Sequence, residues 1–316
     1  MPLPNDEKIV ALSEEILKAF EAIFGPHPGF RPVHAKGALV MGTFTPSSEA
    51  ASLTRAPHAN RESTPVTVRF SDSAGIPLIP DNDPNANPRG FGLRFHLAER
   101  VHTDIVAHST NGFPAKNGEE FLGLLRGIAT SDPANLAGSA LEAFLGSHPK
   151  ALAYVQLPKP APSSFGRESY FGLTALKFTN KDGVSKFGRY SILPEAGNDF
   201  LDDAAAAGKS ANYLFDELTE RLAKGPIKFK VVVQVAEDGD VVDDATVAWP
   251  TERKVVELGT IALTERVPND AGEQKHIIFD PIPRVDGIEA SDDPLLELRA
   301  AVYLLSGRKR RAAPEQ

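Results

Sequence analysis

Residues 66–71 read VTVRFS, a segment in which apolar and polar side chains alternate with a period of two. Successive side chains of a β-strand point to opposite faces, so this alternation predicts a strand with one face in an apolar core. Arg69 and Ser71 share the other face of the strand, which allows both of them to contact the same ligand.

Segments of the same kind lie on both sides of this strand. Phe91, Leu93, Phe95 and Leu97 alternate with polar residues or glycine, and a loop rich in Asp, Asn and Pro precedes them at 81–88. Further strands are predicted at 38–44, 174–180, 187–193, 227–236 and 254–264.

Helices are predicted where apolar residues recur at spacings of three and four, at 9–23, 118–128, 133–147, 211–223 and 293–305. Gly25 ends the first helix. Asp293 can cap the last helix, Pro294 suits its first position, and Gly307 can close it. So many strands with helices inserted between them predict an α+β fold, with an antiparallel β-barrel core and peripheral helices.

The composition is that of a globular protein with a substantial core. Of 316 residues, 41% are apolar and 24% are charged, and 34 basic against 42 acidic residues give a net charge of −8. An acidic chain is not drawn to nucleic acid or anionic lipid, and no apolar run is long enough to cross a bilayer. Residues 1–8 lack the pattern of a secretory signal, so the expected location is cytoplasmic, with no nucleic-acid or membrane partner.

The chain contains no cysteine, which excludes disulfides, thiol nucleophiles, thiolate metal sites and iron–sulfur clusters. An enzyme that meets peroxide benefits from having no thiol to oxidise, and only 2 Met are present. Many proteins of this size have few cysteines by chance. The absence of cysteine alone therefore does not distinguish adaptation to peroxide from chance.

His34 is the first candidate for chemistry. It follows Arg31 and precedes Lys36, immediately before the predicted strand at 38–44. An imidazole titrates near neutral pH and can move a proton within a reaction cycle. A histidine with only a packing or surface role is the commoner case for an isolated His.

Arg299 and Tyr303 form the second candidate, because positions i and i+4 share one face of the predicted last helix. A neighbouring cation or a metal ion lowers the pKa of a phenol, so the pair can hold a tyrosinate as a metal ligand, such as the axial ligand of haem iron. The basic residues at 308–311 allow three interpretations: favourable charges at a helix end, a nucleic-acid contact, or cations for an anionic ligand.

Seven segments together resemble the haem catalases, in the order and rough spacing of that family's core across residues 30–311. They are RPVHAKGALVMGTF (31–44), VTVRFS (66–71), NPRGFGLRFH (87–96), TDIVAHSTNGF (103–113), VAWPTERKVVELGTIALTE (247–265), FDPIPRVDGIEASDDPLLELRAAVY (279–303) and SGRKRR (306–311). The chain has no room for the family's long amino-terminal arm, wrapping segment and carboxy-terminal extension. It is most similar to the small catalase-related peroxidases.

The resemblance implies roles for individual polar residues. His34 matches the distal histidine above the iron, and Ser71 matches the serine bonded to it. Tyr303 matches the proximal tyrosinate ligand and Arg299 its cationic partner. The arginines that match those holding the haem propionates are Arg31, Arg69 and Arg310.

The resemblance also implies an apolar lining for the haem pocket. Val33 matches the residue that narrows the peroxide channel, and Phe113 and Phe121 match aromatic residues of the distal side. Trp249 lies in a matching Trp-Pro segment and is expected only to pack. The amino-terminal helix is assigned to residues 1–28, and the barrel with the proximal helix to residues 29–316.

One position departs from the family pattern. After Asp104-Ile105-Val106-Ala107 the family has an asparagine that helps to hold peroxide for its second oxidation, whereas this chain has His108. Asn111 follows three residues later and can replace that asparagine only if the loop is remodelled. Disproportionation of hydrogen peroxide is therefore expected to be weak or absent, with His108 and Asn111 as candidate catalytic residues beside His34 and Ser71.

The resemblance thus implies a haem peroxidase, with haem b as the expected cofactor, that reduces hydrogen peroxide and organic hydroperoxides. A small-molecule electron donor is required, and a monomer or homodimer is expected. A true catalase and a haem-binding protein without turnover are the alternatives. His34 argues against an enzyme that rearranges lipid hydroperoxides, because those relatives replace the distal histidine.

Overall fold

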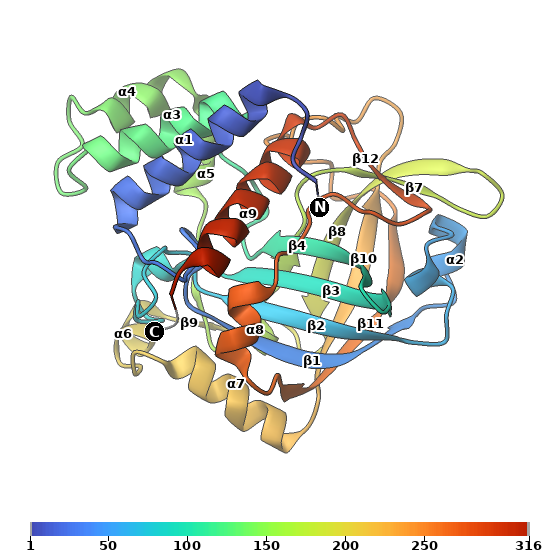
Figure 1. Ribbon diagram of the computed structural model, residues 1–316. Helices are drawn as coiled ribbons and strands as arrows, with labels where there is room; N and C mark the ends of the chain where they lie inside the picture. Colours follow the sequence, from blue (N-terminus) through green and yellow to red (C-terminus); the bar gives the residue numbers. More distant parts are fainter. Residues whose placement is uncertain (1, 315–316) are drawn as a thin grey trace.

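Strand β2 (Thr64–Ser71) contains the alternating segment and lies in the barrel wall between β1 (Gly37–Pro46) and β3 (Gly90–Ala98) (Figure 1). The computed structural model describes residues 2–314. The apolar side chains of β2 enter the barrel core, where the Phe70 ring lies 5.3 Å from that of Phe91 between centroids. The alternation therefore gave the correct faces for this strand.

Antiparallel pairing closes the sheet into a barrel, because β8 pairs with both β6 and β10. The other barrel strands are β4 (Val101–His108), β6 (Tyr170–Phe171), β8 (Ser185–Pro194), β10 (Ile227–Val235) and β11 (Val255–Arg266). Strands β7 (Leu176–Thr179) and β12 (Ile288–Ala290) extend the sheet from β8, and β5 (Ala161–Pro162) pairs with β9 (Phe200–Leu201). The predicted α+β fold with an antiparallel barrel is confirmed.

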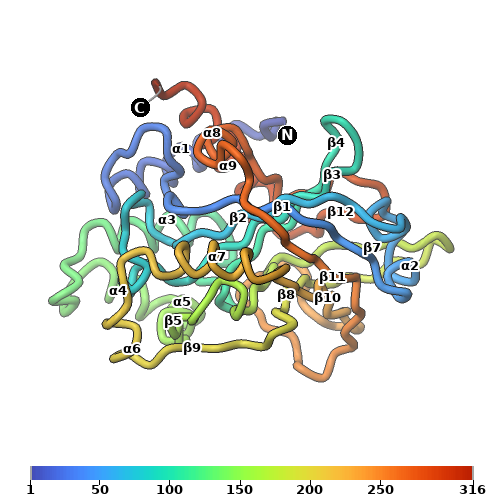
Figure 2. The backbone as a smooth tube through the Cα atoms, turned by 90° about the horizontal axis from the view of Figure 1, so that it is seen from below, coloured from blue at the N-terminus to red at the C-terminus, as the bar shows by residue number. Residues whose placement is uncertain are grey.

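Helices surround the barrel unevenly, and most of them gather on one side of it (Figures 1 and 2). The longer ones are α1 (Glu7–Phe24), α3 (Gly118–Thr130), α4 (Ala140–Ser147), α5 (Pro149–Gln156), α7 (Tyr213–Lys224) and α9 (Pro294–Ala312). Shorter ones are α2 (Ala50–Leu53), α6 (Asp203–Ala207) and α8 (Asp270–His276). Helices α1, α3 and α9 share a second apolar core, separate from that of the barrel.

Two predicted helix boundaries were wrong, and both errors involve glycine. The helix predicted at 133–147 begins only at Ala140, because Gly138 has a φ of 74° and Ser139 caps the helix through the Glu142 N–H. Helix α9 does not end at Gly307 but continues to Ala312. Gly307 lies so close to the Ile278 side chain that a Cβ would collide with it, so this glycine serves close packing rather than helix termination.

Three elements near the cavity described below were not predicted. Strand β4 has no clean alternation of apolar and polar residues, and α5 begins directly after His148, where α4 ends. Helix α8 carries only polar and small residues and so shows no apolar periodicity. Among residues 2–314, no helix combines the length and the hydropathy that a bilayer crossing requires.

Gly42 offers a test of the barrel closure. It lies at the bulge where β1 pairs with β11, and a Cβ there would lie 2.8 Å from the Leu263 Cα and would also strike the Ala262 carbonyl. Because backbone atoms cannot move aside, Gly42→Ala should lower the free energy of unfolding by about 1–3 kcal/mol, measured by urea denaturation. Gly146→Ala, in open space on α4, is the control and should be neutral or stabilising by up to about 1 kcal/mol. Equal stabilities of the two variants would contradict the bulge argument.

Candidate active site

A cavity of about 420 Å³ lies between the outer face of strands β2–β4 and the helices α1, α3, α5 and α9. Figure 1 shows α9 passing in front of these strands, with α1 beside it. The cavity is lined by all the residues predicted for the site except Asn111: Arg31, Val33, His34, Arg69, Ser71, His108, Phe113, Phe121, Arg299, Tyr303 and Arg310. Residues distant in the sequence thus converge on one cavity.

His34 is held by the two segments on either side of it. Its φ of 58° is rare for a non-glycine residue, and its backbone N–H donates to the Ser73 carbonyl at 2.8 Å. Its Nδ1 lies 3.1 Å from the Ser71 Oγ, and Gly90 leaves no room for a Cβ beside either group. Nε2 is therefore the ring nitrogen that remains for a ligand in the cavity.

Burial, followed by the charge of Arg69, lowers the pKa of His34 to about 4. The imidazole is consequently neutral at pH 7 and able to accept a proton. The Ser71 hydroxyl can donate or accept, so it suits His34 both before and after protonation.

His108 ends β4 and lines the same cavity. Its Nδ1 accepts a hydrogen bond of 3.2 Å from the Thr110 backbone N–H. A backbone N–H can only donate, so Nδ1 carries no proton and the proton of the neutral ring lies on Nε2. Burial and then the neighbouring His34 lower the pKa of His108 to about 3, and the ring stays a neutral donor.

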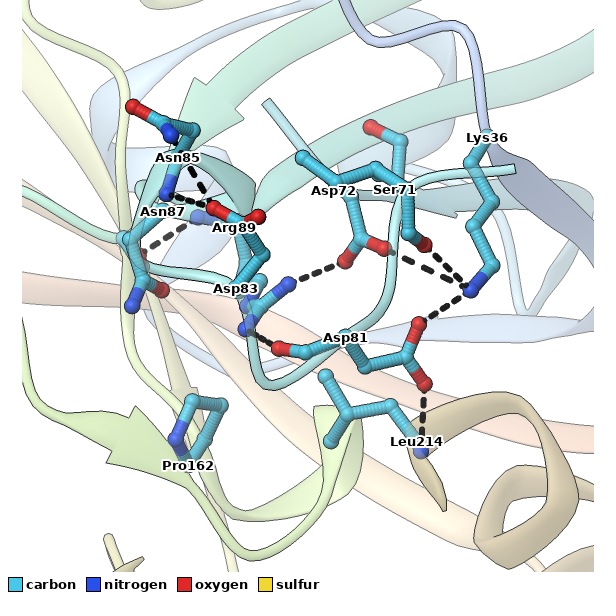
Figure 3. A network of polar contacts seen from close by, with 12 residues as sticks. Lys36, Ser71, Asp72, Asp81, Asp83, Asn85, Asn87, Arg89, Pro162 and Leu214 are labelled. Carbon is cyan, nitrogen blue, oxygen red and sulfur yellow. Dashed lines mark hydrogen bonds and ion pairs between the residues drawn. The ribbon is translucent and has the colours of Figure 1, made fainter. Parts of the chain in front are cut away.

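A buried ion-pair network lies next to the segments that carry the two histidines, and Figure 3 shows the network itself. Arg89, which is completely buried, pairs with Asp72, the residue after Ser71. The Arg89 backbone N–H donates to the Ser109 Oγ at 2.9 Å, and the Ser109 N–H donates back to the Arg89 carbonyl at 2.9 Å. Arg89 therefore links the turn below His34 to the residue that follows His108.

Lys36 and Asp81 complete this network (Figure 3). The Lys36 Nζ lies 2.5 Å from the Asp81 Oδ1 and 3.9 Å from the Asp72 Oδ2, and Asp81 also accepts from the Leu214 N–H at 2.8 Å. Burial raises the pKa of Asp72 to about 7, although the charge of Arg89 opposes this shift. The network thus anchors the loop between β2 and β3 to helix α7.

Three guanidinium groups gather at the cavity wall formed by residues 277–279. The Ile277 carbonyl accepts from Arg31 at 3.0 Å and from Arg310 at 2.7 Å, and Arg69 donates to the Ala35 carbonyl at 3.2 Å. Burial and the mutual repulsion of these charges lower the pKa of Arg69 to about 9, and burial with Arg311 lowers that of Arg310 to about 10. Arg69 and Arg310 are therefore cationic at pH 7 and favour an anionic ligand, while burial, followed by the charge of Arg69, also lowers the pKa of Arg31.

Tyr303 and Arg299 meet on α9 as their spacing predicted. The Arg299 Nε and Nη2 both donate to the Tyr303 Oη at 3.3 Å, and both side chains line the cavity. Two N–H donors thus hold the phenol oxygen, the atom through which a tyrosine binds haem iron.

Aromatic side chains form the apolar wall. The rings of Phe113 and Phe121 lie 5.5 Å apart between centroids, and Phe121 also contacts Phe20 of α1 at 6.1 Å. Trp249 lies elsewhere: its ring packs 4.3 Å from the Arg189 guanidinium carbon, and its Nε1 donates to the Val241 carbonyl. Its position agrees with the packing role expected from the sequence.

Asn111 does not reach the large cavity. It is exposed, and it lines a separate cavity of about 70 Å³ together with Arg189 and Trp249. The chain turns away after Thr110, so the loop is not remodelled in the way that would bring Asn111 beside His34.

Sequence reasoning missed three residues of the site. Tyr154 of α5 lines the cavity, and burial raises its pKa to about 12. Phe279 covers Gly92, where a Cβ would lie only 3.1 Å from the Phe279 ring. Gln274 of α8 accepts from the Arg69 Nε at 2.9 Å. Phe279 and Gln274 follow no periodic pattern, and only their closeness to the conspicuous 279–303 segment could have drawn attention to them.

The chain has relatives of similar length among known proteins. It is 34% identical to a catalase-related peroxidase of Synechococcus elongatus over 94% of this chain and 88% of that protein. It is also 34% identical to a catalase-related peroxidase of Mycolicibacterium paratuberculosis, over 94% of both chains.

Solved structures agree in fold. Catalase A from Saccharomyces cerevisiae gives a TM-score of 0.79 at 23% identity, covering 89% of this chain, and a bacterial catalase gives 0.77 at 25% identity, covering 97%. The chain spans 61% and 62% of the length of those two proteins. The sequence model named Catalase matches residues 28–315. The chain therefore belongs to the catalase family.

Proposed function

We propose that this protein is a haem-dependent peroxidase that reduces hydrogen peroxide and organic hydroperoxides and has weak or no catalase activity. The observation that carries the proposal is the meeting, in one cavity, of the His34–Ser71 pair, the Arg299–Tyr303 pair and three cationic arginines. Membership of the catalase family, whose proteins are haem enzymes, and two catalase-related peroxidases among the relatives support it.

The donor chemistry of the cavity fits haem. Tyr303 would bind the iron through its phenol oxygen, which Arg299 holds in place with two hydrogen bonds. Arg31, Arg69 and Arg310 would hold the two propionates, and the apolar walls would pack against the porphyrin, which we propose is haem b. The bound haem would supply the redox chemistry of peroxide reduction.

His34 would move the proton. Its neutral Nε2 accepts a proton from the peroxide hydroxyl and returns it to the oxygen that leaves as water or alcohol. Ser71 keeps the ring in place through Nδ1 in both protonation states. The two electrons of the reduction come from a small-molecule donor.

His108 supports peroxidase over catalase chemistry. An asparagine amide offers both a donor and an acceptor to a bound peroxide, whereas His108 offers a donor alone, because Thr110 occupies its Nδ1. A peroxide that must give up both its hydrogens is held less well by such a site. A small-molecule electron donor, a monomeric or homodimeric state and a cytoplasmic location stay predictions of the sequence.

Tyr303→Phe removes the phenol oxygen and keeps the ring. We expect haem retention to fall, or the absorption spectrum of the purified protein to lose its tyrosinate character, because Arg299 would then face no ligand oxygen. Tyr154→Phe is the matched control, since it removes a phenol from the same cavity. A Tyr303→Phe protein that binds haem with an unaltered spectrum would exclude Tyr303 as the ligand.

His34→Ala should bind haem but react with hydrogen peroxide about 10²–10⁴ times more slowly, as stopped-flow absorption measures, because the proton acceptor is lost. In the unchanged protein the same rate constant should stay level from neutral pH downwards. It should fall only as the pH approaches about 4, where His34 becomes protonated. If the rate constant instead fell around pH 6.5, the ordinary pKa of histidine, burial would not lower the pKa of His34.

His108→Asn restores an amide at the position that departs from the family pattern. We expect oxygen evolution from hydrogen peroxide to rise, as an oxygen electrode measures, while oxidation of phenolic donors continues. Asn111→Ala is the control and should change neither activity, because Asn111 lines a separate cavity. Oxygen evolution at ordinary catalase rates in the unchanged protein would refute the role given to His108.

A further inference from the structure

The three arginines of the cavity are oriented by neutral acceptors. Among the described residues 2–314, none of the three forms an ion pair with a carboxylate, and they donate to main-chain carbonyls and to one side-chain amide. A neutral acceptor fixes the direction of a guanidinium without cancelling its charge. An anionic ligand that binds the cluster therefore does not have to displace a carboxylate of the described residues from these guanidinium groups.

Gln274 is that amide, and it connects two of the three arginines. Its Oε1 accepts from the Arg69 Nε at 2.9 Å, and its main-chain carbonyl accepts from the Arg31 Nη1 at 3.2 Å. Its Nε2 donates to the Gly37 carbonyl at 2.9 Å and to the Asp270 Oδ1 at 2.8 Å. One side of the amide thus faces a cation and the other side faces two acceptors.

These contacts require an amide rather than a carboxylate at position 274. A glutamate would pair with Arg69 and remove its free charge, and it would also turn an acceptor toward Gly37 and Asp270. Asp270 is itself occupied, since it pairs with Arg266 at 2.7 Å and accepts from the Leu39 N–H at 3.1 Å. The contact with Leu39 attaches α8 to strand β1, and this attachment keeps Gln274 within hydrogen-bonding distance of Arg69.

We propose that Gln274 is a positioning residue that orients Arg69 and Arg31 and leaves them charged for the carboxylates of the haem. This proposal rests on the proposed haem function. It extends the site to helix α8, which contacts both β1 and α9 (Figures 1 and 2). Gln274 acts only through the arginines, since it is not among the residues that line the cavity.

The test compares haem with haem dimethyl ester, in which both propionates are uncharged. Equilibrium binding of each porphyrin is measured on the unchanged protein, Gln274→Glu and Gln274→Met. Both variants should lose about tenfold or more in affinity for haem, the size of a hydrogen bond to a charged group, and little affinity for the ester. Gln156→Glu adds the same charge on the exposed face of α5 and should change neither affinity.

The outcomes separate the two proposals. Loss of affinity for haem alone supports the positioning role, and a parallel loss for haem and ester shows that Gln274 only stabilises the fold, which overturns it. Unchanged affinities in both variants overturn it as well. An unchanged protein that binds neither porphyrin would refute the haem function itself, whatever the variants do. If Gln274→Glu does not fold, Gln274→Met with the two porphyrins decides alone.

Discussion

The ion pair between Arg89 and Asp72 connects the two segments that carry the cavity histidines, His34 and His108. Both side chains are completely buried, and removing one partner of such a pair typically costs about 3–5 kcal/mol, because an unpaired charge stays in the interior. Asp72 follows the serine that holds His34, and Arg89 is joined through its backbone to Ser109, next to His108. The pair therefore joins the segment that holds His34 to the end of β4, which carries His108.

Burial lowers the pKa of both kinds of basic group in this cavity, but it leaves them in different charge states. It lowers the pKa of His34 to about 4 and that of His108 to about 3, so both rings are neutral at pH 7. It also lowers the pKa of Arg69, but only to about 9, because guanidinium starts far higher. The same low dielectric thus yields neutral proton carriers beside permanent cations, which is the combination that proton transfer near an anionic cofactor requires.

The sequence predicted those features that depend on periodicity or local spacing. The faces of β2 and the meeting of Arg299 with Tyr303 follow from periods of two and 3.6 residues. Tertiary contacts decided the rest. The close approach of Ile278 to Gly307 lets α9 continue past a predicted end, and the contacts of Gln274 depend on how α8 docks on β1. The local sequence pattern predicts neither contact, because the two partners of each contact lie in separate segments of the chain.

The cavity is completed only where helices from both ends of the chain meet. Gly118, at the start of α3, leaves no room for a Cβ between Leu12 of α1 and Leu298 of α9, so three helices approach one another at this glycine. Lys309 of α9 pairs with Glu21 of α1 at 3.2 Å on the surface, where such a pair contributes little energy. Apolar packing of α1 and α9 therefore closes the cavity, and its closure depends on the fold of the entire chain rather than on the barrel alone. Tyr303 and Arg310 both lie on α9 and line the cavity. The packing of α9 against α1 that closes the cavity therefore also positions the proposed iron ligand and one of the three arginines.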